Sequence, residues 1–323
     1  METRENTAAK INEFASKGDP FFFVINFDNT CSYVWQLSSI PKDIWISFPG
    51  WTNHAAIKNK SLKRDLIKYP IAFDQYKEVF DNVLKEINRG NSYLTNLTFP
   101  TPVSLNIGFE EIYHNSRSKY TMKFRDEFIV FSPEPFVRIR DNKIFTTPMK
   151  GTINAALPGA KKLLLNDKKE ESEHYTIVDL MRNDLSLIAK NIKVEKFRYV
   201  EEVKSEHYNL LQTSSLISGD LPEDYRKTLG DRIFSILPAG SVSGAPKRET
   251  LKIIKENERY ERGFYTGVMG YFDGENMDSA VMIRFLEKTR NGLIYKSGGG
   301  ITAQSDAFSE YQELIDKVYV PVY

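Results

Sequence analysis

One stretch of the sequence decides how the chain must fold: residues 131–152, FSPEPFVRIRDNKIFTTPMKGT. Apolar and charged residues alternate around an Asp-Asn pair, which is the period-two pattern of a β-hairpin. A hairpin brings its ends together, so Glu134 and Lys150 are expected near each other at one end of a sheet. Pro148 and Gly151 flank the lysine and favour a break in regular pairing that points Lys150 into a cavity. The alternative is an exposed Lys-Glu pair beside a turn, because lysine is mostly exposed in proteins.

The composition is that of a globular protein with ample apolar side chains for a core. Of 323 residues, 41% are hydrophobic, including 21 Phe and 17 Tyr. Lys and Arg total 44 against 43 Asp and Glu, so the net charge is +1. No overall field therefore favours nucleic acid or an anionic membrane, and a small anionic ligand would need a local basic pocket.

Cysteine usage and the N-terminus predict a soluble, cytoplasmic protein. Cys31 is the only cysteine, which excludes an internal disulfide and a multi-cysteine metal site and fits a reducing compartment. The first 20 residues have mixed charges and no apolar core of a signal peptide. No apolar run approaches the roughly 18 residues needed to span a bilayer.

Hydrophobic periodicity predicts scattered helices and short strands rather than regular βαβ repeats. The pattern favours an α+β domain built on antiparallel sheets. The main predicted strands cover residues 21–27, 92–98, 136–145 as a hairpin, 192–195, 210–218, 264–272, 279–287 and 293–298, and the main predicted helices cover residues 76–87, 157–189, 223–237, 247–262 and 305–318.

Acidic residues on two predicted helices suggest a metal site. Glu173 shares a helical stripe with apolar residues one and two turns further on, so its carboxylate needs a partner. In the C-terminal helix, Asp306, Glu310 and Glu313 recur at i, i+4 and i+7, and the two glutamates repel each other unless a cation lies between them. Mg²⁺ prefers oxygen ligands and binds through one or two carboxylates. We expect Glu173 and Glu313 as ligands with Glu310 acting through water; the alternative is that Glu310 and Glu313 are solvated surface residues.

Two further features are candidates for binding an anion. The run Gly298-Gly299-Gly300 is predicted to follow a strand and precede a helix, where its amides can approach a carboxylate closely. The alternative is a flexible turn. Arg284 is a charge in an otherwise apolar predicted strand, VMIRFL, and can grip a carboxylate with two hydrogen bonds. An ion pair at the end of a barrel is the alternative.

Six motifs across residues 75–320 together resemble the chorismate-binding enzymes. They include FSPEPF with TTPMKGT, ESEHYTIVDLMRNDL, GSVSGAPK, ERGFYTGVMGYF and GGGITAQSDAFSEYQEL. The resemblance implies one large domain of two antiparallel sheets packed together with helices outside, in which residues 1–60 are a short N-terminal part and residues 61–323 the catalytic core. It implies Mg²⁺ as the cofactor, with Glu173 and Glu313 as direct ligands and Glu310 as the outer one. The residues implied to bind substrate are Thr152, Ser243, Tyr265, Arg284, Gly298, Gly299 and Gly300.

The lysine before Gly-Thr resembles the residue found at this position in one branch of the family, aminodeoxychorismate synthase component I. Anthranilate synthases typically carry alanine at the same position. This implies amination of chorismate with ammonia to 4-amino-4-deoxychorismate, on the route to p-aminobenzoate and folate. Glu134 would protonate the departing hydroxyl, and Lys150 would attack the ring as a neutral amine, so its pKa would have to fall. No glutaminase nucleophile motif is present, so ammonia is expected from a separate glutamine amidotransferase subunit, in a heterodimer, or from solution.

Two positions depart from the family pattern. Leu94 stands where relatives often carry glutamine, and Gln212 where many carry histidine, with His207 nearby but out of register. These changes argue against a mechanism that needs an imidazole beside the ring. The alternatives are an anthranilate synthase, against which Lys150 argues; an isochorismate synthase, against which Leu94 argues; and a non-catalytic chorismate-binding subunit, against which the retained lysine and carboxylates argue.

Overall fold

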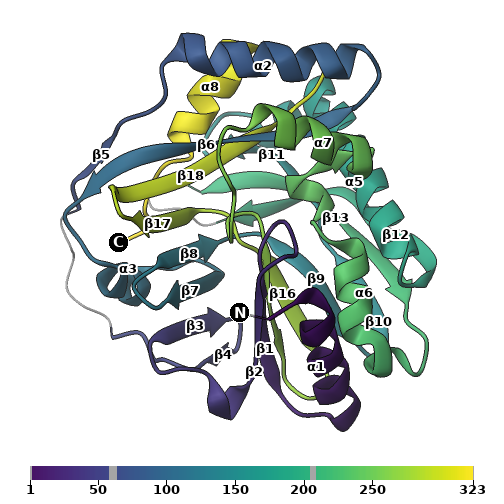
Figure 1. Cartoon of the computed structure of the whole chain (residues 1–323). Helices are drawn as coiled ribbons and strands as arrows, with labels where there is room; N and C mark the ends of the chain where they lie inside the picture. Colours follow the sequence, from purple (N-terminus) through teal and green to yellow (C-terminus); the bar gives the residue numbers. More distant parts are fainter. Residues whose placement is uncertain (1, 58–63, 204–208, 323) are drawn as a thin grey trace.

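The computed structural model describes residues 2–57, 64–203 and 209–322, and in these ranges the chain forms two large antiparallel sheets. Each sheet has nine strands, and helices cover the outer surfaces (Figure 1). The predicted architecture of two packed antiparallel sheets with helices outside is confirmed. Strands β1 to β4 all come from the first 60 residues, and they are divided between the two sheets.

The first sheet carries the predicted hairpin. In order across the sheet, the strands are β11 (Met149–Asn154), β13 (Leu210–Asp220), β10 (Lys143–Thr146), β9 (Pro135–Arg140), β16 (Met277–Val281), β15 (Val268–Phe272), β1 (Phe21–Ile25) and β2 (Ser32–Gln36), and β12 (Lys190–Val203) pairs with β13 outside this path.

The second sheet carries the glycine-rich strand. In order, its strands are β14 (Gly244–Ala245), β6 (Leu94–Leu105), β18 (Gly292–Ile301), β17 (Phe285–Thr289), β8 (Phe128–Ser132), β7 (Tyr120–Phe124), β3 (Ile44–Phe48) and β4 (Trp51–Thr52), and β5 (Leu66–Lys68) pairs with β6.

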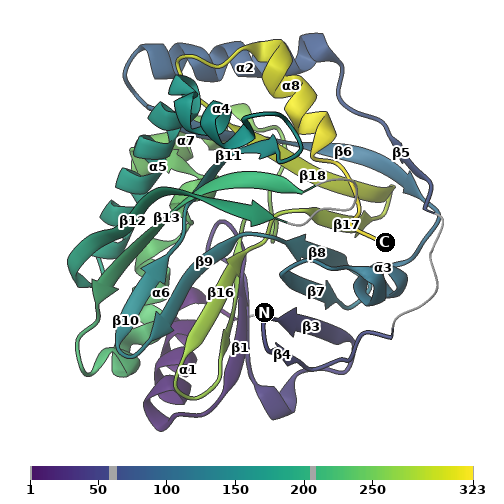
Figure 2. The same cartoon turned by 180° about the vertical axis from the view of Figure 1, so that it is seen from behind.

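The helices form three groups around the sheets. Against the first sheet pack α1 (Arg4–Lys17), α5 (Lys168–Ser186) and α6 (Leu229–Ile236), with α4 (Ala160–Asn166) beside β11. Over β6 and β18 lie α2 (Phe73–Asn88), α7 (Lys247–Asn257) and α8 (Ala307–Asp316). Helix α3 (Phe109–Asn115) packs on β7 and β8 near the C-terminus (Figure 2). Three short 3₁₀ turns complete the list: η1 (Leu37–Ser39), η2 (Tyr225–Thr228) and η3 (Gly240–Val242). None of the helices in the described ranges has the length and hydrophobicity needed to cross a membrane.

The position of strand β1 between two packed layers explains why its sequence is apolar without interruption. Phe21 and Phe23 face the helices α1 and α6, whereas Phe22 and Val24 face the second sheet. All five residues of the strand are buried. A strand that is covered on both faces has no position left for a polar side chain, so the predicted buried strand is confirmed.

The predicted hairpin is also confirmed. Strands β9 and β10 pair in the antiparallel sense across Asp141 and Asn142, whose φ angles are 51° and 57°. Two successive residues with positive φ are typical of the tight turns whose twist matches paired strands, and Asp and Asn tolerate that conformation. The ends of the hairpin are therefore returned to the same region of the sheet.

Two local predictions are wrong. Residues 279–287 are not one strand: β16 ends at Val281 in the first sheet, β17 begins at Phe285 in the second, and Arg284 lies in the crossing with a φ of 55°. The run from Gly298 to Gly300 does not come after a strand and is not the alternative flexible turn, because it lies inside β18 and pairs with β6. A Cβ atom on Gly298 would lie 2.4 Å from the Leu97 carbonyl oxygen, so close strand packing rather than turn geometry requires glycine here.

We predict that Phe22→Ala lowers the free energy of unfolding by about 3 to 5 kcal/mol, because Phe22 is fully buried between the sheets. Phe308→Ala is the matched control: this ring is 62% exposed, and its loss should cost less than about 1 kcal/mol. Chemical denaturation of both variants measures the difference, and equal losses would contradict the assignment of the inter-sheet core.

Candidate functional site

Lys150 and Glu173 form an ion pair between the edge strand β11 and helix α5. The Lys150 Nζ atom lies 2.6 Å from Glu173 Oε2, and the two side chains are 29% and 8% exposed. The pairing of β11 with β13 shifts register between Lys150 and Thr152, where Gly151 has a φ of 80°. The Thr213 hydroxyl donates to the Lys150 carbonyl oxygen on the neighbouring strand. The backbone thus leaves regular pairing at Gly151, and Lys150 is directed toward α5.

The electrostatic surroundings of Lys150 differ from the sequence expectation. Burial alone would lower the pKa of Lys150, but Glu173, supported by Glu170 and Glu313, outweighs burial and leaves the pKa above its ordinary value. The prediction of a lowered pKa is therefore wrong for this structure. Because the amine is held as a cation by Glu173, the ion pair must be broken before Lys150 can act as a nucleophile.

Glu134 lies between β8 and β9, where its carboxyl group has a hydrogen-bond partner and a shifted pKa. The Ser241 hydroxyl donates to Glu134 Oε1 over 2.5 Å. Burial raises the pKa of Glu134 above its ordinary value, although Ser241 and the cations Arg284, Lys317 and Lys150 oppose the rise. A raised pKa makes it easier for a carboxyl group to keep the proton that a general acid delivers to a leaving group.

Lys317 is a site residue that sequence reasoning missed. Its Nζ atom donates to the Gly298 carbonyl oxygen over 2.8 Å and lies 2.7 Å from Glu313. Burial, together with Arg284 and Lys150, lowers the pKa of Lys317 despite that carboxylate. The signal in the sequence was the i, i+4 spacing of Glu313 and Lys317 at the end of the last helix.

Arg284 and the glycines of β18 lie at the same end of the site as Lys317. A Cβ atom on Gly299 would lie 3.4 Å from Glu310 Oε2 and 3.7 Å from Lys317 Nζ, so the absence of a side chain there keeps this space open. The Arg284 Nε atom donates to the Tyr319 hydroxyl over 3.3 Å. The positive charge of Arg284 is one of the causes that lower the pKa of Lys317. Two cations beside a glycine strand are suited to hold a carboxylate.

The remaining predicted substrate residues have different surroundings. Tyr265 is buried, and burial raises its pKa, so its hydroxyl is neutral. Ser243 is fully buried and donates to the Ala239 carbonyl oxygen over 2.9 Å. Thr152 is exposed on β11, opposite Gln212 of β13. Contacts of these side chains with a substrate stay a prediction.

The three predicted metal ligands come from α5 and α8. Glu173 pairs with Lys150, Glu313 pairs with Lys317, and Glu310 accepts a hydrogen bond of 2.8 Å from Ser305. Asp306 is the N-cap of α8. Within residues 2–57, 64–203 and 209–322, no three His, Cys, Asp or Glu side chains are grouped closely enough to hold an ion. Carboxylate oxygens are the ligands that Mg²⁺ prefers, and Glu310 Oε2 would lie 3.4 Å from a Cβ atom on Gly299, but magnesium binding by these three glutamates stays a prediction.

A buried imidazole also lies near the ion pair, at a position that the sequence analysis did not select. His174 Nε2 is 2.6 Å from the Ser215 hydroxyl oxygen, and burial lowers the pKa of His174 to about 4. The imidazole is therefore neutral and links α5 to β13. His207, which is near Gln212 in the sequence but out of register with the family pattern, lies outside the described residues.

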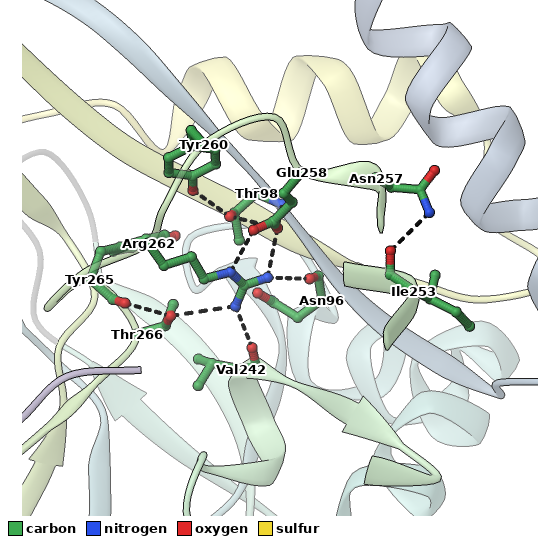
Figure 3. A network of polar contacts seen from close by, with 10 residues as sticks. All are labelled: Asn96, Thr98, Val242, Ile253, Asn257, Glu258, Tyr260, Arg262, Tyr265 and Thr266. Carbon is green, nitrogen blue, oxygen red and sulfur yellow. Dashed lines mark hydrogen bonds and ion pairs between the residues drawn. The ribbon is translucent and has the colours of Figure 1, made fainter. Parts of the chain in front are cut away.

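The buried Arg262 forms a network of polar contacts with the end of α7, the loop before α7 and strand β6 (Figure 3). Arg262 and Glu258 are 2% and 3% exposed and lie 2.7 Å apart. Arg262 also donates to the Val242 carbonyl oxygen over 2.7 Å and to the Asn96 carbonyl oxygen over 2.6 Å. Asn96 pairs with Gly300, so one guanidinium connects the loop before α7 with the glycine strand.

Comparison with known proteins decides the family. The family described as chorismate binding enzyme matches residues 25–322. The chain belongs to the chorismate-binding enzyme family. The chain is 45% identical to an "Uncharacterized PabA-like protein" of Haemophilus influenzae, over 100% of this chain and 98% of that protein. It is 33% identical to aminodeoxychorismate synthase component 1 of Salmonella typhimurium, over 76% of this chain and 56% of that relative.

Solved structures agree with this membership. This chorismate-binding enzyme is similar to anthranilate synthase component I of Streptococcus pneumoniae, with a TM-score of 0.67 and 29% identity over 81% of this chain and 60% of that one. The menaquinone-specific isochorismate synthase MenF of Escherichia coli gives a TM-score of 0.74 over 98% of this chain and 81% of that one, at 17% identity, and shares the fold.

We predict that Glu173→Gln lowers the pKa of Lys150. The substitution removes the carboxylate that raises the pKa and leaves the burial that lowers it. The pH at which Lys150 is half-maximally acylated, followed by mass spectrometry of the labelled peptide, should fall by about one unit or more. Glu287→Gln is the matched control, because it removes the carboxylate from another 2.6 Å ion pair, in which Lys296 is buried and Glu287 is half-buried. An unchanged midpoint in Glu173→Gln would contradict the dominance of this pair.

Proposed function

We propose that this chorismate-binding enzyme is an aminodeoxychorismate synthase component I, which aminates chorismate to 4-amino-4-deoxychorismate with ammonia. The observation that carries the proposal is the ion pair between Lys150 and Glu173, in a site that also holds Glu134 and two further cations. A lysine at this point supplies a nucleophile that an alanine could not. The relative from Salmonella typhimurium that is named for this activity supports the assignment.

The cations would hold the two carboxylates of the substrate. Arg284 and Lys317 flank β18, where Gly299 leaves room for an anionic group. Mg²⁺, bound by Glu173 and Glu313 with Glu310 nearby, would supply electrostatic stabilisation of a ring carboxylate. When Glu173 is engaged in that way, Lys150 loses the partner that holds its proton, and the pKa of the amine is then governed by burial.

The chemistry would then involve two side chains. Lys150 attacks carbon 2 of the ring while the hydroxyl on carbon 4 leaves as water, with a proton from Glu134. Ammonia next forms a bond to carbon 4 and expels the amine of Lys150. The protons balance, because the nitrogen of ammonia loses a proton once it is bonded to carbon 4, and this proton returns to Glu134. The pyruvyl group stays on the product.

The surroundings of Leu94 favour this reaction over hydration of the ring. Leu94 is buried, and a Cβ atom on Gly300 would lie 2.9 Å from its Cδ1 atom. This apolar side chain cannot activate water, which an isochorismate synthase requires. We also propose that ammonia comes from a glutamine amidotransferase subunit, so that glutamine supports the reaction only when that subunit is added.

Lys150→Ala tests the assignment of the nucleophile. Chorismate, Mg²⁺ and ammonium are supplied, and a lyase that releases p-aminobenzoate reports the product. Formation of 4-amino-4-deoxychorismate should fall by about a thousandfold, because the attacking group is gone, while binding of chorismate in the presence of Mg²⁺ survives.

The matched control is Lys143→Ala on strand β10 of the same sheet, which breaks an exposed 2.7 Å ion pair with Asp220 and should retain full activity. An unchanged rate in Lys150→Ala would refute the nucleophile. Anthranilate or isochorismate as the product of the wild-type enzyme would refute the proposed reaction.

A further inference from the structure

The loop from Ala239 to Ser243 presents one side chain toward the site. Ala239, Gly240, Val242 and Ser243 are buried, and Ser241 alone is half-buried. A Cβ atom on Gly240 would lie 2.5 Å from the Met181 side chain, so the loop packs directly on α5. The loop therefore has a buried side that fixes it and a single hydroxyl that reaches outward.

Three hydrogen bonds hold this loop in place. The Val242 carbonyl oxygen accepts from Arg262 over 2.7 Å, and the Ser243 carbonyl oxygen accepts from the Asn96 amide over 2.9 Å. The Ser243 hydroxyl donates to the Ala239 carbonyl oxygen and so connects the two ends of the loop. Figure 3 shows how Arg262 connects this loop to the end of α7 and to β6. Ser241 is thus presented from a rigid support.

Ser241 donates its hydroxyl hydrogen bond to Glu134. The Oγ atom lies 2.5 Å from Glu134 Oε1 and acts as the donor. An oxygen that accepts a strong hydrogen bond is the less basic of the two, so the acidic proton of the carboxyl group belongs on Oε2. Ser241 donates to Glu134 in the protonated and in the ionised form, which keeps the side chain in one orientation.

We propose that Ser241 is a positioning residue for Glu134, which fixes Oε1 as an acceptor and leaves Oε2 to carry the proton that goes to the leaving hydroxyl. This role rests on the proposed function, in which Glu134 is the general acid. Sequence reasoning selected the other serine of the same loop, Ser243, whereas the geometry points to Ser241 as the one that contacts a reacting group.

The charges around Glu134 fix the direction of the pH effect. Arg284 between β16 and β17, Lys317 after α8 and Lys150 on β11 face Glu134, and each favours the carboxylate. Burial works against them and raises the pKa of Glu134. The bond from Ser241 also favours the carboxylate, so its removal raises the pKa of Glu134 further. Glu134 acts in its protonated form, and the alkaline limb of the pH profile must therefore move to higher pH.

The pH dependence of kcat in Ser241→Ala tests the proposal. We expect the alkaline limb to shift upward by about one pH unit and kcat at neutral pH to fall about tenfold, with KM for chorismate changed less than about twofold. Ser241→Thr keeps the hydroxyl and should restore both. The control is Ser32→Ala, which removes a buried side-chain hydrogen bond of 2.6 Å to Thr7 far from the site and should leave the limb in place.

A fall in kcat without a shift of the limb, or a shift equal to that of Ser32→Ala, would overturn the proposal. Infrared titration of the Glu134 carboxyl, identified by its loss in Glu134→Gln, gives a second readout that needs no turnover. If the wild-type enzyme makes no 4-amino-4-deoxychorismate, the proposed reaction fails, whereas an unmoved Glu134 band in Ser241→Ala refutes the role of Ser241.

Discussion

The ion pair between Lys150 and Glu173 is the interaction on which the site depends. Glu173 is buried and Lys150 is half-buried, so removing one partner would leave the other without its counterion. One strand holds both sides of the pair: on β13, Thr213 binds the Lys150 carbonyl oxygen and Ser215 contacts His174, the neighbour of Glu173. Strands β11 and β13 of the first sheet and helix α5 therefore position the proposed nucleophile and its counterion as one unit.

The charged side chains of the site form pairs of opposite sign, and an anionic substrate with a cation could replace the partner in each pair. Lys150 pairs with Glu173, and Lys317 pairs with Glu313, with Arg284 close to Lys317. A diacid that entered with a divalent cation would offer each lysine and each glutamate a new partner of opposite charge. This exchange would release the amine of Lys150 from its carboxylate, which is why the raised pKa of the ion-paired lysine is compatible with a later role as nucleophile.

Parts of the fold that depend on local patterns could be predicted from the sequence. The hairpin around Asp141 and Asn142 follows from alternation and turn chemistry, and the buried strand at Phe21 follows from its uninterrupted apolar run. The failures were non-local. The crossing at Arg284 and the strand position of Gly299 depend on which sheet each segment joins, and periodicity within a segment carries no information about that choice.

The site was predictable to the extent that its residues lie in motifs. Glu173 falls on the buried face of α5 as its spacing indicated. Lys317 was missed because an i, i+4 Glu-Lys pair usually marks an exposed helix face. Glu313 is indeed 57% exposed, and only the packing of α8 against β18 partly covers Lys317. Ser241 was missed in favour of Ser243 because two serines in one loop look alike until the burial of each is known.

The covalent step can be observed directly. The enzyme is incubated with chorismate and Mg²⁺ in the absence of ammonia, and its intact mass is measured and the modified peptide sequenced. If Lys150 displaces the ring hydroxyl, the protein gains the mass of chorismate minus one water, located on Lys150. An enzyme that turns over when ammonia is added but stays unmodified in its absence, or a modification on another residue, would contradict the central claim.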